Sequence, residues 1–283
     1  MCANPLRDHR VTDPVNFIYE NAPLIEVIAE VRWALVPLTS MPGAAVDPLF
    51  PRASERFTEA VGKIGFSHVE RLIPAEVPLE VVAYNPVLRY RREADKWPLF
   101  QIGPGLFSCN ITLPYKGWTA FRSVIGSGLQ ALHESYEFGS VLVEPSMVHV
   151  RYINGFTAKH GMVAFADFCT ADLNLGVALP LGVVGSVADP AGLVFSVEFG
   201  FPLAGMDGSK MGIKCAQGQT KGIPAAILEL SVTRQTDLRL ATNVPDILAW
   251  MDQAHTSIRG IFQQMTSPRL RDAMGPIKQV GRR

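Results

Sequence analysis

The chain has 283 residues, and Lys plus Arg equals Asp plus Glu at 26 each, so its formal charge at pH 7 is zero. Hydrophobic residues make up 48% of the sequence and charged residues 18%, against about 25% charged residues in an average globular protein. This composition excludes a disordered chain, a coiled coil and a basic nucleic-acid-binding module. It predicts a soluble protein of one large or two small domains, whose core needs no disulfide or metal.

The cysteines and histidines do not follow the spacing of a disulfide framework or of a metal site. Cys2, Cys109, Cys169 and Cys215 form no CxxC pair, which favours free thiols in a reducing cytosol. No histidine pair has metal-ligand spacing, and the N-terminus has no secretory signal. We therefore expect a cytoplasmic protein with no membrane segment, no metal and no other cofactor.

Alternating apolar and polar residues predict the first strand, residues 24–33. Ile25, Val27 and the alternate residues after them form its apolar face. The elements expected next are a helix at 54–64 and strands at 79–84, 88–92, 98–103 and 106–113. Gly103-Pro104-Gly105 is typical of a tight turn, so the last two of these strands should form a hairpin.

Two long amphipathic helices are predicted, at residues 118–136 and 244–265. Gly126 and Gly128 weaken the first helix, and a close approach of helix to sheet would explain them. Asn243 is the candidate N-cap of the second helix. The remaining expected elements are a strand at 147–156, a short helix from Phe165, and strands at 192–201, 211–217 and 224–233.

The order of these elements predicts an α+β fold, in which long amphipathic helices pack on one face of an antiparallel sheet. Each half of the chain contains strands followed by one long helix, so we expect two similar halves that share one continuous sheet. The expected division is an N-terminal arm at 1–20, a first half at 21–160, a second half at 161–267 and a solvated C-terminal tail at 268–283.

Charged side chains share one face of several predicted strands. They are Glu26, Glu30 and Arg32, then Arg89 and Arg91, then His149 and Arg151. If these strands are neighbours, the face opposite the helices carries either solvated ion pairs or a charged groove for a ligand or a partner. Arg suits such a groove because its planar fork binds carboxylate or phosphate. We favour ion pairs, with Glu30 and Arg151 as a structural pair.

A second candidate cluster lies along one edge of the C-terminal helix: Asp252, His255 and Arg259. Asp252 could orient His255 for acid–base chemistry. No nucleophile motif accompanies the cluster, and the chain has no phosphate-binding GxxxxGK loop and no GxSxG motif. We therefore favour a histidine at a helix–sheet boundary and predict no catalytic residue.

Several ordered blocks of the sequence resemble one known family. They are NAPLIEVIAEVRW at 21–33, QIGPGLFS at 101–108, RYIN at 151–154, and Ala254-His255 with Ile258 and Phe262. The family is a sporadically distributed set of uncharacterised prokaryotic proteins of about this length, and the resemblance covers nearly the whole chain. That distribution is similar to the distribution of toxin–antitoxin and phage-defence genes, but the family brings no established activity.

These observations together predict a non-catalytic binding or interaction protein that has a protein partner or forms a homo-oligomer. The resemblance implies an accessory, antitoxin-like or immunity component of a mobile defence or toxin–antitoxin locus. Two alternatives stay open. One is a helix-grip-like pocket that holds a small ligand between the sheet and the long helices. The other is an enzyme that uses the polar sheet face on a phosphate-bearing substrate. A nucleic-acid partner is disfavoured by the neutral charge.

Overall fold

The structure, a computed structural model, describes residues 17–40, 42–136, 145–176, 185, 195–235 and 243–279. The strands of its main sheet are β2 (Leu24–Trp33), β5 (His68–Arg71), β6 (Leu88–Arg91), β7 (Leu99–Gly103), β8 (Leu106–Ile111), β9 (Pro145–Phe156), β10 (Ser196–Pro202), β11 (Ser209–Thr220) and β12 (Ile223–Gln235). The helices are α1 (Phe50–Lys63), α2 (Trp118–Tyr136), α3 (Phe165–Ala171), α5 (Val244–Met265) and α6 (Pro268–Ala273). Two small sheets pair β1 (Phe17–Tyr19) with β13 (Ile277–Gln279), and β3 (Val36–Pro37) with β4 (Ala45–Val46).

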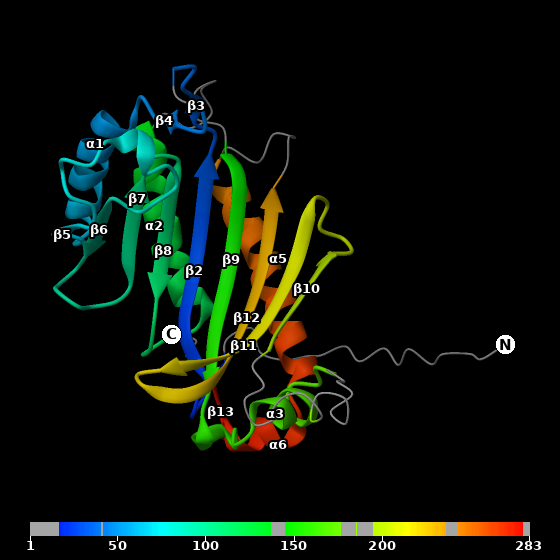
Figure 1. Cartoon of the computed structure of the whole chain (residues 1–283). Coiled ribbons are helices and arrows are strands. Elements are labelled where there is room, and N and C mark those ends of the chain that lie inside the picture. The colour runs from blue at the N-terminus through cyan, green and yellow to red at the C-terminus, as the bar shows by residue number, and fades with distance from the viewer. Residues whose placement is uncertain are drawn as a thin grey trace.

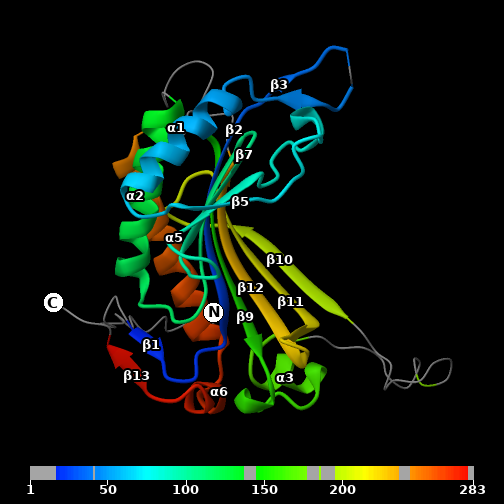
Figure 2. The same cartoon turned by 90° about the vertical axis from the view of Figure 1, so that its left-hand side faces the viewer.

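The main sheet is antiparallel, and its nine strands have the order β10-β11-β12-β9-β2-β8-β7-β6-β5. Helices α1, α2 and α5 lie on one side of this sheet (Figures 1 and 2). This arrangement confirms the predicted α+β fold. Strands β9 and β2 lie side by side at the centre and β9 pairs with β12, so one continuous sheet joins both parts of the chain.

Elements with a strong local pattern lie where the sequence predicts them. Strand β2 and helices α2 and α5 have the predicted bounds, and β7 and β8 form the expected hairpin. The Asn243 side chain caps α5 by accepting a hydrogen bond from the Asp246 N–H at 2.9 Å. Among the described residues, no helix is both long and apolar enough to cross a membrane.

Two local predictions are wrong. The strand expected at 79–84 is a short 3₁₀ helix, Leu79–Val81, within a connection between β5 and β6. Helix α1 begins at Phe50 rather than Ser54, because Pro51 fits the first turn of a helix, where its missing N–H costs nothing. Strand β5 was not predicted, because a four-residue strand shows too short an alternation of apolar and polar residues.

The core lies between the sheet and the three long helices. Large aromatic side chains fill it, including Trp33, Phe57, Phe100 and Phe107, all essentially fully buried. A Cβ atom at Gly128 would lie 2.6 Å from Cε1 of Phe100. Glycine at this position therefore allows α2 to approach the sheet closely, as the sequence analysis proposed.

The expected free C-terminal tail is wrong for residues 268–279, which contain α6 and β13. Ser267 caps α6 by accepting from the Leu270 N–H at 3.0 Å, and Arg269 pairs with the buried carboxylate of Asp172. Strand β13 pairs with β1, so the end of the described chain returns to its beginning. Residues 1–16 of the expected arm, the loop-rich segments 177–184 and 186–194, and residues 280–283 lie outside the described residues.

Candidate functional site

The candidate residues of the polar sheet face all lie on the same face of the main sheet. The register pairs Glu30 with His149 across β2 and β9, and Glu30 with Ser108 across β2 and β8. Ser108 is in turn opposite Gln101, and Gln101 is opposite Arg89. Because paired residues in a sheet point to the same side, one row of side chains runs from β6 to β9 on the face away from the helices.

The β2 and β9 members of this face have partners within the sheet. Glu30, which is 9% exposed, accepts from Nε of Arg32 at 2.6 Å. The expected pair of Glu30 with Arg151 is wrong, because Glu30 binds Arg32 although the register makes it a diagonal neighbour of Arg151. Arg151 instead lies 3.7 Å from Glu229 on β12. One of these pairs lies within β2 and the other joins β9 to β12, so charged side chains of this part of the face pair with one another.

The polar-face residues on β6 and at the start of β2 also have hydrogen-bond or ion-pair partners. Arg89 and Arg91 both bind Glu70 on β5 with distances of 3.0 Å, and the two guanidinium groups hold the pKa of Glu70 below its usual value against the opposing effect of desolvation. Arg91 also donates to the carbonyl oxygen of Lys96 at 2.8 Å. Glu26 accepts from Nδ2 of Asn110 at 2.8 Å.

His149 is the exception in this network. Burial lowers its pKa to about 4, and the positive charges of Arg151 and Arg32 act in the same direction. Its Nε2 atom is buried, with no hydrogen-bond partner among the described residues. The ring is therefore neutral at pH 7, and it adds no charge to the polar face.

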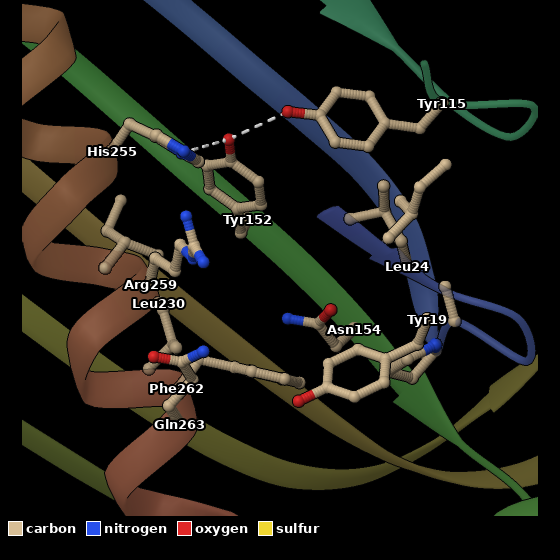
Figure 3. Close-up of a pocket in the computed structure, with 14 residues that line it drawn as sticks. Tyr19, Leu24, Tyr115, Tyr152, Asn154, Leu230, His255, Arg259, Phe262 and Gln263 are labelled. Carbon is tan, nitrogen blue, oxygen red and sulfur yellow. Dashed lines mark hydrogen bonds between the residues drawn. The ribbon is translucent and has the colours of Figure 1, made fainter. Parts of the chain in front are cut away.

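A different cluster of functional groups lies on the other side of the sheet, in a cavity where α5 crosses β9 and β12 (Figure 3). The cavity has a volume of about 110 Å³. Of the residues that the structure describes, fourteen line it: Ile18, Tyr19, Ala22, Pro23, Leu24, Tyr115, Tyr152, Asn154, Leu230, His255, Ile258, Arg259, Phe262 and Gln263. Most of this wall is aliphatic or aromatic, and the polar groups converge from β9 and α5.

A bulge in β2 shapes one wall of this cavity. Opposite β9, Leu24 pairs with Asn154 and Glu26 pairs with Ile153, which leaves Ile25 as an extra residue. An extra residue reverses the alternation of side chains, so Leu24 returns to the helix side and lines the cavity. Ile25 lies against Gly155 on the opposite face, where a Cβ on that glycine would be 2.8 Å from Ile25 Cδ1. The predicted placement of Ile25 on the apolar face is thus wrong.

The polar core of the cavity is a chain of hydrogen bonds. Nδ1 of His255 lies 2.8 Å from the Tyr152 hydroxyl, which lies 3.2 Å from the Tyr115 hydroxyl (Figure 3). Burial lowers the pKa of His255 to about 4, and the charge of Arg259 lowers it further. Burial also raises the pKa values of both tyrosines. All three groups are therefore neutral at pH 7, and act as hydrogen-bond donors and acceptors.

Asp252 does not hydrogen-bond to His255, as an acid–base pair would require. Its carboxylate accepts from Nε1 of Trp118 at 2.7 Å and from Nε of Arg122 at 2.8 Å, which ties α5 to α2. The Trp118 indole in turn stacks on the His255 ring, with centroids 4.6 Å apart and planes 6° from parallel. Of the predicted helix-edge cluster, His255 and Arg259 line the cavity, and Asp252 holds the surrounding helices together.

Four of the cavity residues were not predicted as functional: Leu24, Tyr115, Tyr152 and Asn154. One signal was present. Tyr152 and Asn154 continue the alternation of Val148 and Val150 on the apolar side of β9, so an amide occupies a core position. A buried amide needs hydrogen-bond partners. An amide among the apolar residues on this side of β9 therefore indicates a place where a cavity or a ligand supplies them.

Comparison of the chain with protein-family models, with curated proteins and with solved structures found no match. In the part of the chain that the structure describes, no group of three His, Cys, Asp or Glu side chains is placed to hold a metal ion.

Proposed function

We propose that the protein is a binding protein whose cavity between α5 and the sheet holds a small, mostly apolar ligand. The observation that carries this proposal is the combination of an apolar wall with a few converging polar groups, namely Tyr152, Asn154, His255 and Arg259. Such a combination is typical of small-molecule sites. It corresponds to the helix-grip-like alternative of the sequence analysis.

The volume of the cavity limits the size of the ligand. At about 110 Å³, it is somewhat smaller than an engineered apolar cavity of about 150 Å³ that binds benzene. One aromatic ring or a short branched alkyl group therefore fits inside, and a nucleotide does not. A larger ligand would place only such a group in the cavity.

The chemistry of the lining favours binding over catalysis. A general base near neutral pH needs a pKa near 7, whereas burial holds the pKa of His255 at about 4. The tyrosine hydroxyls stay protonated because their pKa values are raised. The His255 and tyrosine side chains therefore provide neutral hydrogen bonds, which suit recognition of a ligand.

Thermal melting with small apolar probes tests this proposal. Toluene and indole should raise the melting temperature in a concentration-dependent way, because a ligand that binds only the folded state stabilises it. Leu24→Phe fills the cavity and should abolish the shift. Leu113→Phe is the matched control, because Leu113 is 49% exposed and does not line the cavity. Equal shifts in both variants, or no shift in the parent protein, would contradict the proposal.

A second candidate function, protein association, is favoured by the edge strand β10. Phe199 and Phe201 are 43% and 37% exposed on this strand, which is the last strand of the main sheet on that side among the described residues. An exposed apolar edge strand readily pairs with another strand. A second copy of the chain offers the same edge, so antiparallel β10–β10 pairing would form a symmetric dimer. A partner-binding role of the kind that the resemblance implies would also need such a surface.

The oligomeric state tests this second candidate. Light scattering after gel filtration should give twice the chain mass for the parent protein and the chain mass for Phe199→Lys. Val163→Lys is the control, because Val163 is 92% exposed and lies outside the sheet. A monomeric parent protein would refute dimerisation through β10.

A further inference from the structure

We infer that the ligand of the cavity is a small apolar molecule that carries one amide group, and that Asn154 binds this amide through a pair of hydrogen bonds. This inference rests on the proposed function and adds the chemical class of the ligand. It starts from the position of Asn154 on the apolar side of β9. The residue is 5% exposed, and its amide points from β9 into the cavity (Figure 3).

The hydrogen bonds of the Asn154 side chain are incomplete. An asparagine amide has two N–H donors and a carbonyl oxygen that accepts. The Nδ2 group of Asn154 makes one long contact, 3.5 Å to the carbonyl oxygen of Leu228, and no described residue donates a hydrogen bond to its Oδ1 atom. A buried polar group without a partner lowers the stability of a protein. Asn154 therefore keeps a donor and an acceptor for a molecule in the cavity.

The chain of hydrogen bonds from His255 to Tyr115 does not include Asn154. The Tyr152 hydroxyl lies 2.8 Å from Nδ1 of His255 and 3.2 Å from the Tyr115 hydroxyl. Figure 3 shows Asn154 apart from this chain, further along β9 and beside Leu24. The Tyr152 hydroxyl already has its partners, so the amide of Asn154 offers a ligand the hydrogen-bonding capacity that this hydroxyl does not.

The chemistry of Asn154 selects the functional group of the ligand. Its Oδ1 atom accepts and its Nδ2 group donates, and the two lie side by side in one plane. A primary amide or a lactam has the complementary pair, an N–H beside a carbonyl oxygen, just as the edge of adenine binds an asparagine through two hydrogen bonds. A carboxylate offers only acceptors, and a ketone would leave Oδ1 without a donor.

The apolar walls determine the body of the ligand. Leu24, Leu230, Ile258 and Phe262 form them, and the volume of about 110 Å³ accommodates one ring or a short branched chain. Benzamide has both features, since its single ring carries one primary amide. Acetophenone has nearly the same shape, but a methyl group replaces the NH₂ group. The two molecules therefore differ in the donor that Oδ1 of Asn154 needs.

Calorimetric titration with benzamide, acetophenone, benzoate and toluene tests the inference. The parent protein should bind benzamide about tenfold more tightly than acetophenone, because acetophenone leaves the buried Oδ1 atom unpaired. Asn154→Leu should remove this preference, because leucine has a similar shape but neither donor nor acceptor. Asn85→Leu is the matched control and should keep the full preference, since Asn85 is exposed and does not line the cavity.

The outcomes separate this inference from the proposed function. If toluene binds but benzamide binds no more tightly than acetophenone, the cavity is a ligand site and the amide assignment is wrong. Tighter binding of benzoate than of benzamide would also overturn that assignment, because the cavity would then select a negative charge. If no probe binds the parent protein, both the proposed function and this inference are refuted.

The role of Asn154 is decided separately. If Asn154→Leu folds, as judged by circular dichroism, and keeps the preference for benzamide, Asn154 does not bind the amide. If that variant does not fold, NMR spectroscopy of the parent protein decides the question. The side-chain amide resonances of Asn154 should shift with benzamide and not with acetophenone, and equal shifts would refute its role.

Discussion

Acidification should destabilise the protein through two histidines that folding buries in neutral form. Burial lowers the pKa of both His255 and His149 to about 4, from 6.5 for an unperturbed histidine. Between these two values the unfolded chain binds more protons than the folded chain. The stability of the folded chain is therefore complete above pH 6.5 and falls progressively as the pH decreases toward 4.

The size of the effect follows from the same shifts. At pH 5 an unfolded histidine is almost fully protonated, whereas one with a pKa of about 4 is mostly neutral. Proton linkage then gives a loss of about 2 kcal/mol per histidine at pH 5 relative to pH 8. His255→Gln and His149→Gln each remove one titrating group. Each variant should lose about 2 kcal/mol less than the parent protein between pH 8 and pH 5.

Urea unfolding followed by tryptophan fluorescence at the two pH values measures this difference. Comparing each variant with itself across pH cancels any loss of packing caused by the substitution. His68→Gln is the matched control, since the His68 side chain is 42% exposed. If His255→Gln shows the same acid sensitivity as the parent protein, burial does not hold the His255 ring neutral.

Three further results are expected. Ile258→Ala should lower the free energy of unfolding by about 2–5 kcal/mol, because Ile258 is only 2% exposed. A change below about 1 kcal/mol in urea unfolding would show that α5 is not part of the core. Arg151→Ala should cost less than about 1 kcal/mol, because Arg151 and Glu229 are each about one-third exposed, and a larger loss in the same assay would indicate a buried pair. Cys169 and Cys215 are free, with sulfur atoms 3.6 Å apart. Thiol titration in urea should therefore find all four cysteines reduced, and reductant should leave the melting temperature unchanged; a lower count would reveal a disulfide.

The sequence by itself determined the elements that depend only on interactions between residues close together in the chain. The alternation in β2, the stripes of α2 and α5, the Asn243 cap and the Gly103–Gly105 turn all depend on contacts between near neighbours in the chain. For the same reason the placement of Glu26, Glu30 and Arg32 on one face of β2 could be predicted. These features need no knowledge of which strands become neighbours.

The tertiary structure decided the features that depend on strand order and register. Glu30 on β2 and Glu229 on β12 are both diagonal neighbours of Arg151, and the tertiary structure decides that the ion pair forms with Glu229. The cavity exists because a one-residue bulge turns Leu24 to the helix side, and because α5 brings His255 and Arg259 over Tyr152 and Asn154. The pairing of strands that are distant in sequence depends on packing and hydrogen bonding throughout the fold. A shift of the pairing register by one residue exchanges the two faces of a strand. No local pattern contains that information.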